Sequence, residues 1–580
     1  MIRFGSQAFS LPMRRLLPLL LLFTLACSLF SPRATPTALP ESATPLAHET
    51  ATPPPPATPT VATTPSTPVI ISSPLPTGPF HLKPSDVTFH PDPQLYSGDR
   101  VSLELDAANA DPTWQEASVS VFIDSLTGEP LATANFAPFG IAGNAQATFY
   151  WVWDTIGRVG PQTVIITINP RTEGAEPLEA LTLTVNLLPA SARPMPEPLA
   201  RWTQTESACC IFHYLTGTAA ERDIATITVT ADESFEEVEE TLGVTRQDKV
   251  VFTLLSRLLG HGGFASDEIS LTYIDRNAAY GTLVNVFKHE DTHILDRQIA
   301  RERPTIMTEG MAVYVAGGHF KPEDLEKRAA ALLILEDYIP LTELADDFYF
   351  AQHEIGYLEG GAFITYLVDK FGWEPVKTFY GSFQSAPTDS AMLDAALRAN
   401  FNQSLEELEA EWLTHLSSLP PDLAQVEDLR LTVMLYDTLR RYQQANDPAA
   451  YFLTAWLPYG PEARERGIVA DFVRHPSAPE NIALETMLAA AGEALVAQHF
   501  DNAEALLLAV NAVLDSNNLF FDPLAAEYLQ IVTTLSAHGY EAQSILLDSD
   551  TATATIIHTW PATQSLTLTR DLTGWQLAGD

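Results

Sequence analysis

The sequence predicts a multidomain fold: a β-sandwich, then an α+β domain, then a mainly helical region that ends in a small β meander. Length is the first reason, because 580 residues are too many for one hydrophobic core. Composition is the second, since 46% hydrophobic residues suffice for globular packing. The third is the hydrophobic period, which is two residues before about residue 190 and mostly helical further on. The expected segments are 1–27, 28–80, 81–190, 197–420 and 421–580.

The start of the chain has the features of an export signal. Arg14 and Arg15 precede an apolar run over residues 16–26, which is too short to span a bilayer comfortably. Residues 24–27 resemble a bacterial lipoprotein cleavage box, with Thr24 in place of the usual leucine. This resemblance implies that Cys27 becomes a lipidated N-terminus, which would anchor the protein to the membrane on the extracytoplasmic face of the cell envelope. An ordinary secretory peptide cut nearby is the alternative.

The next segment, residues 28–80, is rich in Pro, Thr, Ala and Ser. Such a composition cannot build a core, so we expect an extended, semi-rigid and disordered tether. Behind a lipid anchor, it would hold the folded part away from the membrane.

Charge is strongly acidic over the whole chain. There are 32 Lys and Arg residues against 73 Asp and Glu residues, a formal net charge of −41. A phosphate backbone would be repelled, so we expect no nucleic-acid partner. We interpret the acidity as solubility outside the cell.

Residues 81–190 alternate apolar and polar side chains in short runs separated by Gly, Pro and Asn. This pattern predicts a β-sandwich of roughly a hundred residues. It resembles the immunoglobulin-like modules of bacterial surface proteins, which implies a spacer or a low-affinity binding module. The expected strands include 101–105, 119–121, 148–153, 164–168 and 181–185.

Besides Cys27, the chain has two cysteines, Cys209 and Cys210, which are adjacent. A disulfide framework is therefore not expected. We interpret the pair as two small apolar residues in a strand. A vicinal disulfide is the alternative.

The remainder of the chain mixes strands with helices and then becomes mainly helical. A helix over 218–242 is expected to end near Gly243, and helical patterns continue to about residue 418. The strands expected first are 210–215, 250–255 and 269–274. Later elements are helices over 429–444, 482–497 and 500–514 and strands over 551–557 and 566–569. We interpret residues 421–580 as an α+β accessory region.

The pattern H-E-x-x-H occurs at His289, Glu290 and His293. In a helix, residues four apart lie on one face, about one turn from each other. Both imidazoles can therefore turn toward one metal ion, while Glu290 on the adjacent edge can reach a water on that ion. Glu309 follows after enough residues to finish the helix, turn and bring a second helix alongside. The sequence thus predicts a metal site with His289, His293 and Glu309 as ligands.

These residue types match the chemistry of a catalytic zinc site. Zinc binds neutral imidazoles and a carboxylate and keeps one position for water, whose pKa it lowers. A nearby carboxylate takes the proton of this activated water and passes it to the leaving group, a role for which Glu290 is placed. Phe287 and Leu295 supply apolar positions around the motif, as in a buried helix. A surface helix with two exposed histidines is the alternative.

Further segments accompany the motif. Residues 309–314 read Glu-Gly-x-Ala-x-Tyr, and Tyr357 precedes the apolar segment 363–372. Residues 404–412 form a further helical segment. Together with the motif, they resemble the peptidase-MA-like domain of the gluzincin zinc metallopeptidases. The resemblance extends from about residue 208 to 418, a little over a third of the chain.

The resemblance implies hydrolysis of peptide bonds with one catalytic Zn²⁺ and Glu290 as general base. It also implies that the hydroxyl of Tyr357 stabilises the oxyanion, a task of preorganised donors. A packing tyrosine is the alternative, and His353 and His319 are rivals for the task. The strand over 269–274 resembles the family's edge strand beside the cleft, where an extended substrate can pair with the sheet.

The chain departs from the family at several positions. Asp291 and Thr292 lie inside the motif where apolar residues are common, and Arg303 to Ile306 replace Leu-Pro-x-Trp. Val313 replaces a carboxylate that supports a ligand in some gluzincins. Asp296 is a candidate to orient an imidazole instead.

We therefore expect a membrane-anchored, extracytoplasmic zinc metallopeptidase that acts on a protein or peptide. The alternative is a catalytically silent, surface-anchored binding or scaffold lipoprotein. The intact motif favours the enzyme.

Overall fold

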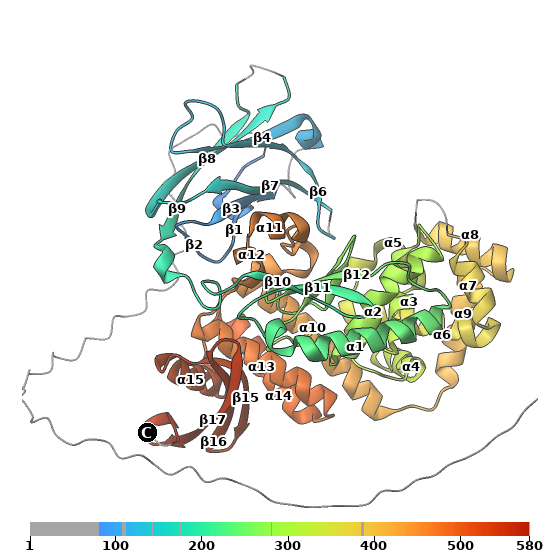
Figure 1. Cartoon of the computed structure of the whole chain (residues 1–580). Coiled ribbons are helices and arrows are strands. Elements are labelled where there is room, and N and C mark those ends of the chain that lie inside the picture. Colours follow the sequence, from blue (N-terminus) through green and yellow to red (C-terminus); the bar gives the residue numbers. More distant parts are fainter. Residues whose placement is uncertain are drawn as a thin grey trace, which may run out of the picture. The chain divides into compact units, whose positions relative to one another are not determined.

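The computed structural model describes residues 80–106, 112–141, 143–172, 176–279, 281–383 and 388–578 (Figure 1). All of them belong to the second of two compact units, Met1–Pro65 and Ser66–Asp580. The predicted export signal, Cys27 and the tether up to residue 79 lie outside the described residues.

An N-terminal domain of two β-sheets follows. One sheet has the order β1-β3-β7-β6 and the other has the order β2-β9-β8-β4-β5. Both contribute to one core, in which Leu105, Val119 and Ile166 are fully buried. The predicted strands of this region are present within β3, β4, β7, β8 and β9, while four shorter strands were not predicted. The strands are β1 (Val87–His90), β2 (Leu95–Tyr96), β3 (Arg100–Asp106), β4 (Ala117–Ile123), β5 (Ala132–Asn135), β6 (Ala137–Phe139), β7 (Asn144–Asp154), β8 (Gly160–Pro170) and β9 (Glu179–Leu188).

A third sheet begins the region that carries the H-E-x-x-H motif. Its order is β10-β11-β12-β14-β13, with parallel pairs β11–β12 and β12–β14. The strand β14 is present, but the prediction that it forms the edge of the sheet is wrong. Its hairpin partner β13 pairs with it and is itself the edge. A three-residue strand containing Gly263 has no alternation by which it could be predicted. The strands are β10 (Trp202–Glu206), β11 (Cys210–Leu215), β12 (Val250–Leu255), β13 (Gly263–Ala265) and β14 (Ile269–Thr272).

Helix α1 (Ala219–Leu242) ends as predicted at Gly243, whose φ of 60° gives the left-handed conformation common at helix C-termini. It packs against α2 (Leu283–Leu295), the helix of the motif. Phe287 of α2 lies in the same core as Phe252 of the sheet, with ring centroids 5.3 Å apart. The motif is therefore held between the sheet and the helices that follow.

Helix α3 (Thr305–Ala316), which carries Glu309, crosses α6 (His353–Phe371) at close range. A Cβ on Gly310 would lie 2.5 Å from the carbonyl oxygen of Gly360, so glycine is required at this crossing. Helix α6 is therefore the close partner of α3 at Gly310. The other helices to residue 418 are α4 (Leu325–Leu335), α5 (Leu341–Asp347), α7 (Trp373–Tyr380), α8 (Ser390–Phe401) and α9 (Leu405–Ser418).

The C-terminal region contains helices and a four-stranded antiparallel sheet of order β15-β16-β17-β18. The predicted meander is confirmed, and β15 extends it beyond the predicted strands. The helices are α10 (Leu423–Asn446), α11 (Gly460–Arg466), α12 (Ala470–Val473), α13 (Pro479–Val496), α14 (Phe500–Asp515) and α15 (Pro523–Ala537). The strands are β15 (Glu541–Asp548), β16 (Thr551–Thr559), β17 (Ala562–Asp571) and β18 (Gly574–Leu577).

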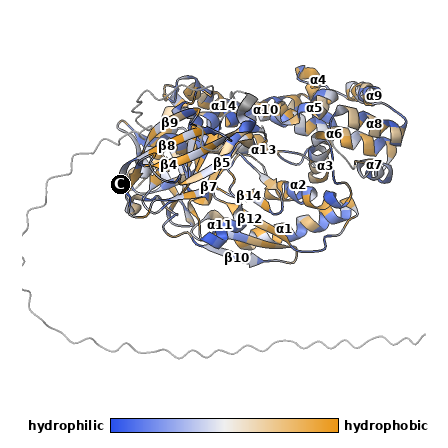
Figure 2. Cartoon of the chain, turned by 90° about the horizontal axis from the view of Figure 1, so that it is seen from above, coloured by the Kyte–Doolittle hydropathy of each residue, from blue (hydrophilic) through white to orange (hydrophobic). Residues whose placement is uncertain are grey.

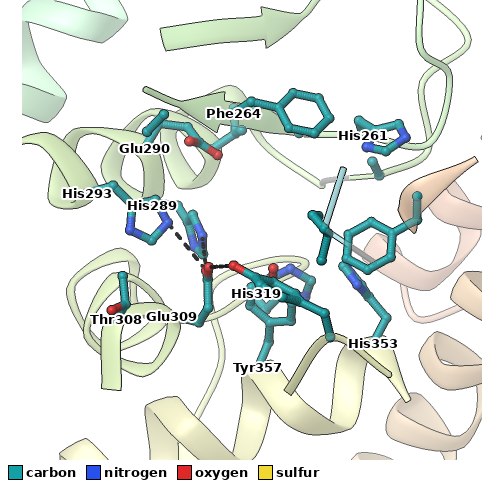
Figure 3. Close-up of a pocket in the computed structure, with 18 of the residues that line it drawn as sticks. His261, Phe264, His289, Glu290, His293, Thr308, Glu309, His319, His353 and Tyr357 are labelled. Carbon is teal, nitrogen blue, oxygen red and sulfur yellow. Dashed lines mark hydrogen bonds and ion pairs between the residues drawn. The ribbon is translucent and has the colours of Figure 1, made fainter. Parts of the chain in front are cut away.

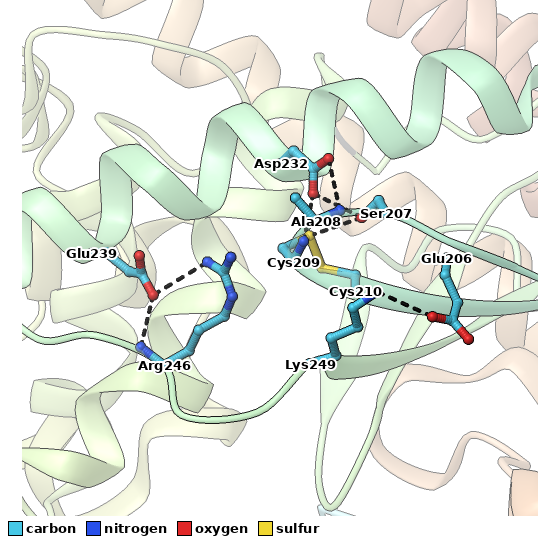
Figure 4. Close-up of a disulfide and its surroundings, with 9 residues drawn as sticks. All are labelled: Glu206, Ser207, Ala208, Cys209, Cys210, Asp232, Glu239, Arg246 and Lys249. Atoms are coloured by element: carbon cyan, nitrogen blue, oxygen red, sulfur yellow. Dashed lines mark hydrogen bonds and ion pairs between the residues drawn. A yellow bond between two sulfur atoms is a disulfide. The ribbon is translucent and has the colours of Figure 1, made fainter.

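Cys209 and Cys210 form a vicinal disulfide (Figure 4). Their interpretation as free apolar residues was wrong. Asp232 of α1 accepts hydrogen bonds from the backbone N–H of Cys209, at 2.7 Å, and from the hydroxyl of Ser207, at 2.7 Å. The disulfide thus lies in a turn that is bonded to α1, a contact that adjacent cysteines do not reveal in sequence.

Apolar and polar residues are intermixed along the helices of this unit (Figure 2). In the part of the chain described, no helix combines the length and apolar character needed to cross a membrane.

Candidate metal centre

Helix α2, which carries the motif residues, has a capped N-terminus. The hydroxyl of Thr282 accepts a hydrogen bond from the backbone N–H of Asn285 at 3.2 Å, which caps the first turn. The amide of Asn285 also donates to the carbonyl of Ala316 at the end of α3. These contacts fix the two helices that carry the predicted ligands.

The predicted ligands His289, His293 and Glu309 come together (Figure 3). The Nε2 atoms of His289 and His293 each lie 3.3 Å from Oε2 of Glu309. One possible ligand atom from each of the three residues lies within 4.8 Å of the other two. Two imidazole nitrogens and a carboxylate oxygen that converge on one point form the donor set of a catalytic zinc site. The residues present therefore fit a Zn²⁺ ion.

The protonation states of these groups depend on burial and on their mutual charges. Burial lowers the pKa of His289 from 6.5 to about 4. Burial also opposes charge on His293, but Glu309 outweighs it and raises the His293 pKa to about 9. Although burial disfavours its ionised form, the two histidines hold the pKa of Glu309 well below 4.5. Glu309 is therefore an ionised carboxylate shared between two imidazoles.

Glu290 lies beside the ligands, outside their group. Its side chain is held against edge strand β13, where a Cβ on Gly263 would lie 2.6 Å from its carboxyl carbon. Burial raises the pKa of Glu290 from 4.5 to about 7. A carboxyl group with a pKa near neutral can both accept and return a proton.

Tyr357, the predicted oxyanion donor, lies on α6 and lines the same cavity. Its ring centroid is 5.9 Å from that of His289 and 4.2 Å from that of His319. The rivals His319 and His353 also line the cavity. Nδ1 of His319 is 2.7 Å from Oε2 of Glu354, so one nitrogen of that ring is bonded to a carboxylate.

Tyr349, which the sequence did not indicate as a site residue, makes a direct contact with the predicted ligand Glu309. Its hydroxyl donates to Oε1 of Glu309 at 2.8 Å. It therefore occupies the second oxygen of the carboxylate whose first oxygen faces the histidines. In sequence, Tyr349 lies between Phe348 and Phe350 and has no signal beyond aromatic packing.

Asp296 does not orient an imidazole. It accepts a hydrogen bond from the hydroxyl of Tyr380 at 2.5 Å and forms an ion pair with Arg303 at 3.2 Å. Nδ1 of His293 is buried without a hydrogen-bond partner among the described residues. The suggested role was wrong because residues from other elements occupy the Asp296 carboxylate.

These groups open on a cavity of about 410 Å³. Besides the motif residues, its lining includes groups from the loop after β12, from α10 and from the segment after α10 that the sequence did not single out. They are His261, Tyr436, Arg440 and Phe452. Figure 3 shows His261 and His353 at the other end of the cavity from His293 and Glu309.

Comparison with family models finds no match for this chain, and neither does comparison with curated proteins. Among solved structures, it is similar to an M1 zinc metallopeptidase mutant from Deinococcus radiodurans, with 15% identity and a TM-score of 0.24. That match covers 53% of this chain and 63% of the other, so the chain spans less than two thirds of it. Yeast LTA4 hydrolase matches at 11% identity and a TM-score of 0.30, over 78% of this chain and 86% of the other. Because these identities and TM-scores are low, only the site residues themselves support a function.

Proposed function

We propose that this protein is a zinc-dependent metallopeptidase of the gluzincin type. One observation carries the proposal: His289 and His293 direct Nε2 atoms to the same oxygen of Glu309, each at 3.3 Å, at the wall of an open cavity. The buried carboxyl of Glu290 lies beside that point. Peptides are the substrates that the motif implies.

His289, His293 and Glu309 would hold the ion. Bound Zn²⁺ supplies a Lewis acid that polarises the substrate carbonyl and lowers the pKa of water. Glu290 takes a proton from the attacking water and gives it to the leaving amine. Tyr349 holds the Glu309 carboxylate through its 2.8 Å hydrogen bond. We assign stabilisation of the oxyanion to the hydroxyl of Tyr357.

An extended substrate would bind along β13. This strand is the edge of its sheet, and Gly263 brings its backbone against Glu290. Backbone pairing at an edge strand is a common mode of peptide recognition. It would place a peptide bond next to the general base.

We also propose that Cys27 carries a lipid anchor and that residues 28–80 form the tether to an immunoglobulin-like spacer. The basic and apolar segment before Cys27 supports the anchor. Two sheets around one core support the spacer. Cys27→Ser should release the protein from the membrane fraction into the soluble fraction.

Glu290→Gln tests the catalytic proposal. It removes the base but none of the ligands, so we expect kcat on a peptide library to fall on the order of 10²- to 10⁴-fold. Zinc content, measured by elemental analysis, should stay near one per chain. Glu302→Gln, an exposed glutamate in the loop after the motif, is the matched control and should keep activity.

The same experiment distinguishes the enzyme from the scaffold alternative. A purified ectodomain that holds no zinc and cuts no peptide would identify a silent binding protein. Undiminished proteolysis by Glu290→Gln would show that another residue is the base.

A further inference from the structure

Arg440 on α10 differs from the most deeply buried arginines of the protein. Each of those pairs with a carboxylate, at distances between 2.5 and 2.8 Å: Arg257 with Asp92, Arg276 with Glu485, Arg328 with Asp428 and Arg474 with Asp99. Arg440 lines the cavity of the candidate metal centre. Within the described part of the chain, no acidic side chain forms an ion pair with Arg440.

The contacts of Arg440 leave one side of its guanidinium without a hydrogen-bond partner among the described residues. Nη1 donates to the carbonyl of Gly260 at 3.2 Å and to Oε1 of Gln443 at 3.1 Å. The guanidinium carbon lies 4.2 Å from the centroid of the Phe452 ring. Nε is buried without a hydrogen-bond partner, and no described residue accepts a bond from Nη2. Nε and Nη2 form the side-on fork that matches the two oxygens of a carboxylate.

The other arginines of the cavity are already engaged. Arg303 pairs with Asp296 at 3.2 Å. Arg297 donates to the carbonyls of Ser266 and Ala265 at 2.7 and 3.1 Å and is exposed to solvent. Among the described arginines that line the cavity, Arg440 is thus the one with unused hydrogen-bond donors.

Among the described residues, the neighbours of Arg440 form no ion pair with it. Nε2 of His261 donates to the carbonyl of Ala450 at 2.7 Å, and burial followed by the charge of Arg440 lowers the His261 pKa to about 3. Burial, again followed by Arg440, lowers the pKa of His353 well below 6.5. Asp437, one turn earlier on α10, accepts a hydrogen bond from Gln352 at 3.1 Å. Both histidines are therefore neutral, while the charge of Asp437 raises the Arg440 pKa without an ion pair between them.

A partly buried cation that lacks an ion pair is costly, and proteins normally pair such a charge. In agreement, burial lowers the pKa of Arg440 from 12.5 to about 10. A carboxylate that entered the cavity would offset this cost. It would also be discriminated from a neutral group, since the neutral group would leave the fork unpaired.

We propose that the Nε–Nη2 fork of Arg440 binds a carboxylate of the peptide substrate, so that the enzyme selects peptides with a negative charge close to the cleaved bond. This inference rests on the proposed peptidase function. The ligand is one chemical group with two possible sources, the C-terminal carboxylate or an Asp or Glu side chain.

The geometry also limits where the carboxylate lies in the substrate. Successive ring centroids from the ligand His289 to Tyr357, His353 and Phe452 are 5.9, 4.7 and 4.6 Å apart, and Arg440 covers Phe452. An extended chain advances about 3.3–3.6 Å per residue. The path through these groups sets an upper bound, so the selected carboxylate lies within about five residues of the cleaved bond.

The test is affinity selection with zinc-loaded Glu290→Gln protein, which binds peptides without cutting them. Two random libraries of acetylated pentapeptides serve as probes, one with free C-termini and one with C-terminal amides. Retained peptides are identified by mass spectrometry, and dissociation constants are measured by calorimetry. We expect carboxylate-bearing peptides to be enriched and Arg440→Gln to weaken their binding about 10- to 100-fold, as for other hydrogen bonds to charged groups.

Two further variants make the result specific. Arg441→Gln removes the same charge from the next residue of α10, which contacts Asp515 and Asn511 instead of the cavity, and should bind as the parent does. Arg440→Lys keeps the charge and should retain a preference for carboxylates even if Arg440→Gln folds poorly. Selection that survives amidation identifies acidic side chains, and selection that disappears identifies the C-terminus.

Equal retention of the free and amidated libraries with no enrichment of Asp or Glu, no retention at all, or equal losses in Arg440→Gln and Arg441→Gln would overturn the inference. Failure of the proposed function is seen separately. In that case the wild-type protein holds no zinc or leaves both libraries uncut.

Discussion

Two buried histidine–carboxylate clusters in this protein contain similar residues but have opposite properties. At the metal centre, His289 and His293 direct Nε2 atoms to one oxygen of Glu309, and Nδ1 of His293 has no hydrogen-bond partner in the described part of the chain. In the N-terminal domain, His90 bonds Asp92 through Nδ1 at 3.3 Å and Glu104 through Nε2 at 2.9 Å.

The second cluster, His90 with Asp92 and Glu104, is closed on all sides. The His90 ring is fully buried and stacks on Trp456 with centroids 4.0 Å apart, while Asp92 pairs with Arg257 at 2.5 Å. Both imidazole nitrogens are occupied by carboxylates, so neither is available to a metal. The metal centre instead opens on a cavity of about 410 Å³.

The pKa values of His90 and His293 do not distinguish the two clusters. Burial opposes charge on both His90 and His293, yet neighbouring carboxylates raise the pKa of each to about 9. The difference lies in geometry: converging nitrogens with open space mark a ligand set, and diverging, satisfied nitrogens mark a structural ion cluster.

Removing a histidine from each cluster should therefore have different effects. His293→Gln should weaken zinc binding by more than about 100-fold, because loss of a ligand exceeds the 10–100-fold cost of losing a ligand's support. Zinc content and peptide turnover should both disappear. His90→Gln should retain both but lower the free energy of unfolding by about 3 kcal/mol, since it leaves buried carboxylates without their partner. Loss of zinc in His90→Gln would refute the distinction.

The closed cluster should also make stability depend on pH. The pKa of His90 rises from 6.5 to about 9 on folding, so the folded state binds this proton more tightly. Its stabilising contribution is complete below pH 6.5, falls as the pH rises, and is lost above about pH 9, a total of about 3 kcal/mol. Urea unfolding of the parent and of His90→Gln at several pH values measures it. A parallel pH dependence in the two proteins would contradict the assignment.

The two tyrosines of the metal centre should affect different quantities. Tyr349→Phe removes the 2.8 Å hydrogen bond to Glu309 and should weaken zinc binding about 10- to 100-fold, measured by competition with a chelator. Tyr357→Phe should leave zinc affinity unchanged and lower kcat. The reverse pattern would exchange the roles proposed for them.

The smallest effect is expected from the vicinal disulfide. Cross-linking adjacent residues removes little chain entropy from the unfolded state, so reduction should cost about 1 kcal/mol or less. Thermal unfolding with and without reductant tests this, with Cys209→Ser as the matching variant. A large loss of stability would show that the turn bonded to Asp232 needs the disulfide.

Much of the architecture follows from local pattern. Alternation predicted the long strands of the N-terminal domain, and the helical period predicted α1 and the helices to residue 418. Short strands such as β13 were missed because three residues carry no periodic signal. That omission led to the wrong edge strand.

The sequence by itself determined the ligand set, because helical periodicity places His289 and His293 on one face and the spacing to Glu309 permits a second helix. Only the tertiary structure decided what surrounds that set. It brings Tyr349 to Glu309, directs Asp296 to Arg303, and carries Arg440 from a distant helix to the same cavity. Such contacts join elements far apart in the chain, and packing, which leaves no local pattern, selects them.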